Sequence, residues 1–391
     1  MNLYFDNAAT SRVCQEALEA MKKAALDIYG NPSSLHFEGV NAEGMIEEGR
    51  QFFGKFLGVS PKELYFTSGG TESNNLAVQG VAKAYIRSGK HIITTSIEHP
   101  SVGSTCAYLE EEGFRVTRLK VDESGHIDLE ELKSSISEET SLVSIMHVNN
   151  EIGTVQNLVE IGKVIKAANK ATLFHVDAVQ GFLKIPFSIK KAQIDLLSIS
   201  SHKVYGPKGS GLLYIRKGSK IKPLQYGGSQ QNAIRPGTEN VPGIMGFYKA
   251  ALKGAEEMEN NYRHVIKLKK LFIQQMEEDL PLWTINSKAS HGNYDQEVVS
   301  PFIINVRSSS LKGEVILHAL EDYKINVSTG SACSSRKMNI SHVLKAIGLE
   351  DEESDHSIRI SLSAHQDEED IRELVKALVQ IDHMFGRFVR K

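Results

Sequence analysis

The chain has 391 residues, which at about 100 to 200 residues per domain predicts two or three packed domains and excludes a single small module. Lys plus Arg number 45 and Asp plus Glu number 48, giving a net charge of −3, so the basic excess of a dedicated nucleic-acid-binding protein is missing. Hydrophobic residues make up 41 % and charged residues 24 %, the composition of a globular protein with a sizeable core.

The three cysteines, Cys14, Cys106 and Cys333, lie far apart in the sequence. Their number and spacing fit neither a disulfide framework nor a cysteine-rich zinc site, and favour a reducing compartment. The first residues, MNLYFDNAATS, lack the basic and apolar pattern of an export signal, and no apolar run approaches the roughly 18 residues needed to cross a bilayer. We therefore expect a cytoplasmic protein with no membrane or nucleic-acid partner and no metal.

Short apolar runs alternate with helical stretches between Glu63 and Ile215. Several of these runs are apolar throughout, which predicts that helices cover both faces of the sheet they form. The pattern is that of an α/β fold with a largely parallel sheet. The predicted strands are residues 64–67, 91–95, 114–119, 142–148, 172–176, 194–199 and 212–215.

A second, smaller α/β pattern follows a loop at 226–243, rich in glycine and amides, and a charged helix at about 254–279. We assign residues 16–257 to a large domain, and residues 1–15 and 258–391 to a small domain. The small domain's predicted elements are strands 302–306, 325–327 and 357–361, helices 313–323 and 340–347, and a final helix starting near Asp367.

Polar residues and glycines follow five of the predicted strands. In open α/β sheets, ligands bind beyond the carboxyl ends of the strands, so we expect these residues to converge on one site. They are Gly69, Gly70 and Thr71, then His99, then Asn149, then Asp177 and Gln180, and finally Ser200, His202 and Lys203.

The segment SGGTESN places two glycines and a threonine at a predicted helix start. Free N–H groups and the positive end of the helix dipole attract a phosphate there. The alternative is an ordinary glycine turn with Thr71 or Ser73 as the N-cap.

Lys203 follows a buried strand, where desolvation would free its amine for Schiff-base chemistry, unless it is simply a solvated lysine at a strand end. Asp177 offers the carboxylate that a pyridinium nitrogen requires. Its alternative, a metal site shared with His175, lacks a third ligand of suitable spacing. His99 is a candidate for stacking on a flat cofactor and for proton transfer, or else a core histidine.

Cys333 lies in STGSACSSRK, a run of small polar residues that predicts an exposed, reactive thiol. Cys14 and Cys106 fall in helical patterns, and we interpret them as structural. Arg359, in SIRIS, is either a salt-bridge residue or a bidentate clamp for a carboxylate.

Taken together, these motifs resemble those of cysteine desulfurases of the NifS and IscS kind, within the aminotransferase class V group of enzymes that use pyridoxal 5'-phosphate (PLP). The resemblance runs nearly end to end and implies the type I fold of PLP-dependent transferases. SSHK with HVDAVQ is typical of the PLP group, and GSACSS with SIRIS of the desulfurases. The other matching segments are DNAAT, GNPSSLH, TSGGTESNN, EHPS, NNEIGT and RPGTEN.

The resemblance implies a role for each site residue. Lys203 would hold PLP as a Schiff base, and His99 would stack on its ring. Cys333 would be the nucleophile that accepts sulfur. The remaining implied roles are Asp177 at the pyridine nitrogen, Asn149 and Gln180 at the ring hydroxyl, Gly70, Thr71, Ser200 and His202 at the phosphate with Thr238 from a second subunit, and Arg359 with Asn31 at the substrate carboxylate.

The implied reaction converts L-cysteine to L-alanine and leaves a persulfide on Cys333. The implied partners are a second copy of the chain and a sulfur-acceptor protein, either an iron–sulfur scaffold or a protein of tRNA or thiamine thiolation. Two alternatives remain. One is another class V reaction, such as selenocysteine lysis or transamination, with Cys333 incidental, and the other is a non-catalytic scaffold of the same fold.

Overall fold

The computed structural model describes residues 2–287, 298–329 and 340–389. No helix in these ranges is long and apolar enough to cross a membrane. In chain order the elements are β1 (Leu3–Tyr4), α1 (Gln15–Leu26), α2 (Phe37–Leu57), η1 (Pro61–Glu63), β2 (Leu64–Thr67), α3 (Gly70–Ala84), β3 (His91–Thr95), α4 (Pro100–Glu111), β4 (Arg115–Leu119), α5 (Leu129–Ser135), β5 (Thr140–Met146), α6 (Leu158–Ala168), β6 (Leu173–Asp177), β7 (Leu196–Ser200), η2 (Ser201–Lys203), β8 (Gly211–Ile215), η3 (Gln230–Ala233), α7 (Val241–Asp279), β9 (Thr284–Ile285), β10 (Ile303–Arg307), α8 (Gly313–Asp322), β11 (Ile325–Asn326), α9 (His342–Ala346), α10 (Asp351–Asp355), β12 (Ser357–Ser361) and α11 (Glu368–Val389).

The large sheet has the strand order β2-β8-β7-β6-β5-β3-β4. The strands β7, β6, β5, β3 and β4 are parallel to one another, and β8 pairs antiparallel with both of its neighbours, β2 and β7. The predicted α/β class with a largely parallel sheet is therefore confirmed.

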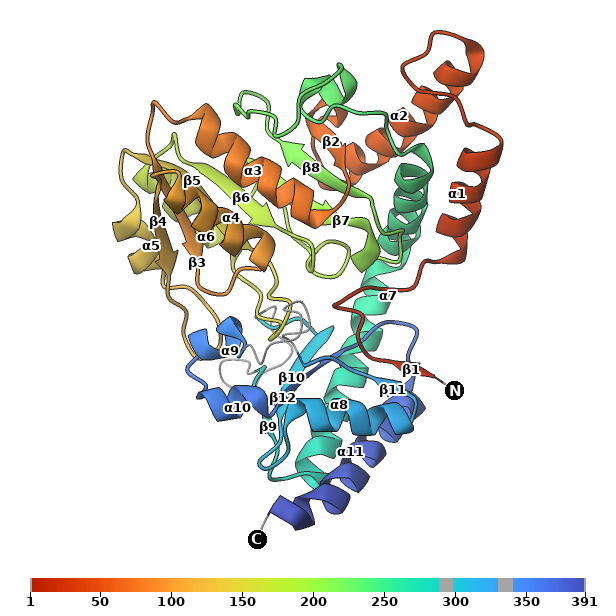
Figure 1. Cartoon of the computed structure of the whole chain (residues 1–391), viewed down its shortest axis with the longest axis vertical. Helices are drawn as coiled ribbons and strands as arrows, with labels where there is room; N and C mark the ends of the chain where they lie inside the picture. The colour runs from red at the N-terminus through yellow and green to blue at the C-terminus, as the bar shows by residue number, and fades with distance from the viewer. Residues whose placement is uncertain (1, 288–297, 330–339, 390–391) are drawn as a thin grey trace.

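Alternate residues of the central strands enter two different cores, because successive side chains of a strand point to opposite faces. Ile92 and Leu142 pack with α3 and α4 on one face, and Ile93 and Val143 pack with α2, α6 and α7 on the other. Figure 1 shows these helices around the sheet. Both faces are covered, as the apolar strand runs predicted.

The helix α7 joins the large sheet to a second core. Its first half, from Val241 to Ala251, packs in the large-sheet core, and its second half, from Val265 to Met276, packs with α8, α11 and the sheet β12-β10-β9. Leu3 joins this second core, and β1 pairs with β11. This packing supports the division into a large and a small domain that we propose.

The start of α7 differs from the sequence prediction. The helix begins at Val241, whereas the sequence predicted a loop to residue 243 and a helix from about 254. The side chain of Asn240 accepts the N–H of Gly243, and Pro242 lies in the first turn, so the glycine-rich segment ends in a capped helix start.

The short helix α9 belongs to the small-domain segment but packs against the large domain. Val343 and Leu344 form a buried cluster with Ile97 and Met146, which flank the ends of β3 and β5. His342 Nε2 lies 2.9 Å from the carbonyl oxygen of Glu98. The two domains therefore share a packed boundary next to His99.

A buried carboxyl group ties the turn after β3 to β5. Glu98 Oε1 accepts the N–H of Met146 at 2.9 Å and the hydroxyl of Thr95 at 2.8 Å. Glu98 Oε2 is buried and has no hydrogen-bond partner in the described residues. Burial raises the pKa of Glu98 to about 8, so the side chain is a neutral acid at pH 7.

The Glu98→Gln substitution should therefore change how stability depends on pH. Because the folded protein holds the Glu98 proton more tightly than the unfolded chain does, wild-type stability falls between roughly pH 4.5 and pH 8, and this loss levels off at higher pH. A glutamine keeps the acceptor oxygen and cannot ionise. In thermal melts of the cofactor-free protein from pH 5 to pH 9, the Tm difference should shift steadily in favour of the variant up to about pH 8.

The exposed Glu112→Gln variant, at the end of α4, controls for the loss of one carboxylate from the chain. A Tm difference between Glu98→Gln and wild type that stays constant across this range would mean that Glu98 is ionised in the folded protein.

Candidate functional site

The candidate site lies where the carboxyl ends of the central strands meet the small domain. Lys203, three residues after the end of β7, contacts Ala8, and Asn150, in the loop after β5, contacts Arg359 on β12. This is the sheet edge at which the sequence predicted a ligand.

Asp177, the last residue of β6, is buried at the centre of this edge. Its carboxylate accepts the side-chain amide of Asn74 at 2.7 Å and the backbone N–H of Val179 at 2.9 Å. Burial raises the pKa of Asp177, and the hydrogen bond from Val179 and the nearby charge of Lys203 act against this shift. A buried carboxylate of this kind is stabilised by a cationic group beside it, as a protonated pyridine nitrogen would be.

The alternative metal site at Asp177 does not form in the described part of the chain. His175 uses both ring nitrogens in the protein core, with Nδ1 2.8 Å from Ser144 Oγ and Nε2 3.0 Å from Ser198 Oγ. No three His, Cys, Asp or Glu side chains in the described ranges come together as a metal site would require.

His99 is the N-cap of α4, and its hydrogen bonds define its tautomer. The backbone N–H of Ser101 donates to His99 Nδ1 at 3.1 Å, so Nδ1 is an acceptor and the proton of the neutral ring lies on Nε2. Ser101 Oγ lies 2.8 Å from the same nitrogen and accepts the Asn74 amide at 2.9 Å. Burial lowers the pKa of His99. Asn74 and Ser101 thus link a neutral His99 to Asp177.

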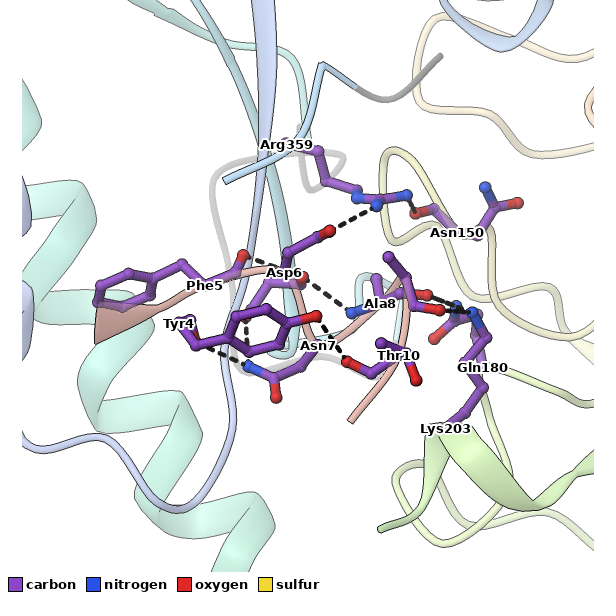
Figure 2. A network of polar contacts seen from close by, with 12 residues as sticks. Tyr4, Phe5, Asp6, Asn7, Ala8, Thr10, Asn150, Gln180, Lys203 and Arg359 are labelled. Atoms are coloured by element: carbon purple, nitrogen blue, oxygen red, sulfur yellow. Dashed lines mark hydrogen bonds and ion pairs between the residues drawn. The ribbon is translucent and has the colours of Figure 1, made fainter. Parts of the chain in front are cut away.

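Lys203 Nζ donates to the carbonyl oxygens of Ala8 and Ala9, each at 2.6 Å. Figure 2 shows the Lys203 side chain directed at Ala8. Gln180 Nε2 donates to the same Ala8 carbonyl at 2.8 Å. Gln180 Oε1 in turn accepts from Lys184 Nζ at 3.3 Å, which fixes the orientation of the amide. Burial and the repulsion of Lys203 lower the pKa of Lys184 to about 7.

The helix α3 begins at Gly70, and free N–H groups at such a helix start attract anions. A Cβ added to Gly70 would lie 2.8 Å from Val179 Cγ2, so this close approach requires glycine. Gly69, the N-cap residue, has a φ of 151°, and Thr71 is exposed in the first turn. The N-cap is therefore Gly69, not Thr71 or Ser73.

A buried hydroxyl with no partner lies beside this helix start. Ser200 Oγ, at the end of β7, has no hydrogen-bond partner in the described residues, and it lies 3.8 Å from the position of a Cβ built on Gly69. His202 Nδ1 lies 3.2 Å from Thr10 Oγ1, and burial lowers the pKa of His202 to about 4. An unsatisfied hydroxyl next to free helix N–H groups fits a phosphate group.

Asn149 is fully buried in the loop after β5, where its amide is engaged with the backbone. Oδ1 accepts the N–H groups of Glu151 and Ile152, and Nδ2 donates to the carbonyl of Ile97 at 3.0 Å. Asn149 thus holds this loop against the turn that carries His99. Its predicted contact with a cofactor hydroxyl stays a prediction.

Arg359, on β12, is 5 % exposed, and its guanidinium is held from two sides. Nη2 donates to Asp6 Oδ1 at 2.8 Å and Nη1 to the carbonyl of Asn150 at 3.0 Å, as Figure 2 shows. The Nε–H group is buried and has no partner in the described residues. Within the described part of the chain, Arg359 thus keeps one unsatisfied charged donor, the kind of group that binds a carboxylate.

Asn31 and Thr238 are both exposed, and Asn31 Oδ1 accepts the backbone N–H of Ser33 at 3.0 Å. Figure 1 shows the loop between α1 and α2, which carries Asn31, at the far end of the large domain from β12.

The predicted nucleophile, Cys333, lies outside the described residues. Cys106 is buried on α4, and burial raises its pKa to about 12, so it is an unreactive thiol at neutral pH. Cys14 is the N-cap of α1, not a residue within a helix, and burial raises its pKa as well.

Four residues that contact the site were missed in the sequence. Asn74 and Asp6 lie inside the recognised segments TSGGTESNN and DNAAT, but no spacing rule assigns them a partner. Lys184 follows Gln180 by four residues, which is a detectable signal for a shared contact. Asn150 contributes only its backbone carbonyl, which no sequence pattern reveals.

Comparison with known proteins finds relatives that match nearly the whole chain. The model of the aminotransferase class-V family matches residues 3–374. A relative from Dictyoglomus turgidum, named cysteine desulfurase IscS, is 43 % identical over 97 % of this chain and 94 % of its own length. A solved structure of a NifS-like protein has a TM-score of 0.91 and 39 % identity, covering 98 % of this chain and all of that one. Another, of SspA in complex with cysteine, has a TM-score of 0.77 and 36 % identity, covering 92 % and 98 %.

These matches confirm the type I fold of PLP-dependent transferases that the sequence resemblance implied. The family match and the likeness to the NifS-like structure each span most of both domains. The chain belongs to the aminotransferase class-V family.

Proposed function

We propose that this protein is a cysteine desulfurase, which converts L-cysteine to L-alanine and transfers the sulfur to Cys333 as a persulfide. Its cofactor is PLP, the cofactor of the family. The observation that carries the proposal is the meeting of Lys203, Asp177 and His99 at one sheet edge, in a chain 43 % identical to a protein named cysteine desulfurase IscS.

The residues of the site fit this cofactor. Asp177 would hold the ring nitrogen, and Lys203 would hold the aldehyde carbon. The start of α3, with Gly70 and Thr71, and the unpartnered hydroxyl of Ser200 would hold the phosphate. PLP, when bound, supplies an electron sink for the bonds at the substrate's α-carbon.

The remaining groups act on the substrate and its protons. Arg359 would bind the substrate carboxylate through its unpartnered Nε–H. His99 presents a neutral ring with the proton on Nε2, so it can donate that proton and later accept one. Gln180, its amide fixed by Lys184, and Asn149 would lie near the ring hydroxyl, with His202 near the phosphate.

Cys333 would carry the sulfur. Its thiolate attacks the substrate sulfur, so that the S–S bond forms as the C–S bond breaks, and the carbon skeleton takes up a proton and leaves as L-alanine. The persulfide then passes to a thiol of an acceptor protein. We propose an iron–sulfur scaffold or a thiolation protein as this acceptor, and the cytoplasm as the location.

We further propose that the protein acts as a homodimer in which each site is completed by the other subunit. Large apolar side chains are exposed around the loop that carries Asn31, an unusual arrangement for a monomer. They are Leu35 at 97 %, Phe37 at 75 %, Tyr29 at 73 % and, from the segment that carries Thr238, Tyr226 at 84 %. Gln230 Nε2 lies 3.5 Å from Ser33 Oγ, which places the two segments side by side. If a second copy covers this surface, Asn31 and Thr238 of each chain would lie at the site of the other chain.

The Cys333→Ser variant tests the reaction. With PLP and a thiol reductant, the wild-type protein should form alanine from L-cysteine. The rate of the variant should be lower by more than about a hundredfold, because a hydroxyl cannot accept the sulfur. Cys14→Ser is the matched control and should keep the wild-type rate. Alanine from both Cys333→Ser and wild type, or from neither while the cofactor absorbs, would indicate a different class V reaction.

Mixed dimers test the shared site. Two parent homodimers should be inactive. One carries Lys203→Ala in both chains, and the other carries both Asn31→Ala and Thr238→Ala in both chains. In a heterodimer purified through two different tags, one of two sites is complete, so about half of the wild-type rate should return. A heterodimer no more active than its parents would place Asn31 and Thr238 in their own subunit's site, and a monomer at every concentration would contradict the dimer.

A further inference from the structure

The N-terminal segment, residues 6–9, lies between the two charged groups of the site. At one end Asp6 pairs with Arg359, and at the other the carbonyl groups of Ala8 and Ala9 accept from Lys203 (Figure 2). The motif DNAAT, to which the proposed function gives no role, therefore contacts both the cationic residue for the substrate carboxylate and the cationic residue for the cofactor.

Asp6 and the loop after β5 fix the plane of the Arg359 guanidinium. Arg359 Nη2 donates to Asp6 Oδ1 at 2.8 Å, and Nη1 donates to the Asn150 carbonyl at 3.0 Å. A guanidinium is planar with its five N–H donors in a rigid fork, so two acceptors on its terminal nitrogens set the direction of the Nε–H group. That group is buried and has no partner in the described residues.

The position of Asp6 is itself fixed by the strand that carries Arg359. Asn7 Nδ2 donates to the carbonyl of Ser361 at 3.0 Å, and the Ala8 N–H donates to Ser361 Oγ at 2.9 Å. Asp6 forms a backbone bridge with Ser361, which lies two residues after Arg359 on β12. The backbone of Asp6 is therefore bridged to β12, the strand that carries the Arg359 guanidinium.

The charge of the pair changes how an incoming carboxylate is recognised. Asp6 neutralises Arg359, whose side chain is 5 % exposed, so the pair offers little net charge to attract an anion. What it offers is a donor of fixed direction. Such a group distinguishes a carboxylate from an amide by geometry and by the strength of a charge-assisted hydrogen bond.

We propose that Asp6 is a positioning residue, which holds Arg359 with its Nε–H edge directed at the carboxylate of an amino-acid substrate. This inference rests on the proposed function for the identity of the substrate. The rival role for Asp6 is that of a competitor, a carboxylate that occupies Arg359 until the substrate displaces it. The two roles predict opposite effects of removing the Asp6 carboxylate.

Binding of L-alanine and of L-alaninamide to the PLP-loaded protein tests Asp6 without turnover. Wild type should prefer alanine, because only alanine has a carboxylate for Arg359. Asp6→Ala should weaken alanine binding about tenfold and leave alaninamide binding unchanged, so that the preference is lost. Asp6→Asn, which keeps an acceptor oxygen at the same place, should retain part of the preference and guards against a misfolded Asp6→Ala protein. Asp279→Ala, at the exposed end of α7, is the matched control.

Several results would overturn the assignment. Tighter alanine binding by Asp6→Ala would identify a competitor, and an equal loss for both ligands, with a lower Tm, would identify a structural residue. A wild-type protein that does not discriminate between alanine and alaninamide would contradict it too.

Desulfuration of L-cysteine separates this inference from the proposed function. Suppose that the wild-type protein makes alanine from L-cysteine, and that Asp6→Ala keeps the wild-type preference for alanine over alaninamide. This result would overturn the role of Asp6 alone. A wild-type protein that makes no alanine, yet loses its carboxylate preference on Asp6→Ala substitution, would overturn the proposed function and leave the role of Asp6 standing.

Discussion

The N-terminal segment that contacts both Lys203 and Arg359 is the constraint on which the site depends. The N-terminal segment is anchored on β12 of the small domain, and it reaches across to the residue that ends η2 of the large domain. One short segment therefore sets the relative positions of Lys203 and Arg359, which come from opposite sides of the domain boundary. The packing of α9 against the turn before His99 closes the same boundary at a second place.

Burial decides the charge state of the groups around this contact. Loss of water raises the pKa of Asp177 and lowers the pKa of His99, so a neutral imidazole lies near a carboxylate that a bound cation would stabilise. Lys184 is a second lysine in the same surroundings, with its pKa lowered to about 7. A site with two amines and a buried acid favours Schiff-base formation and proton transfer near neutral pH.

The sequence predicted many of the strands in both parts of the chain because their signals are local. The strands that became β2, β3 and β12 have the predicted bounds, since apolar β-branched runs end at clear turn residues. The predicted start of α7, near residue 254, was wrong because the cap at Asn240 lies inside a glycine-rich segment. The contact of Asp6 with Arg359 joins residues 353 positions apart, and the link from Asn74 to Asp177 joins residues 103 apart, so neither follows from periodicity.

The most direct test of the account is to find which lysine holds the cofactor. Borohydride reduction of the PLP-loaded protein, followed by peptide mass spectrometry, fixes the cofactor to the amine that holds it. We predict one pyridoxyl-phosphate group per chain, on the peptide that contains Lys203. The same peptide of the Lys203→Ala variant should carry no label. A label on Lys184, the neighbouring amine with the lowered pKa, or no specific label, would contradict the account.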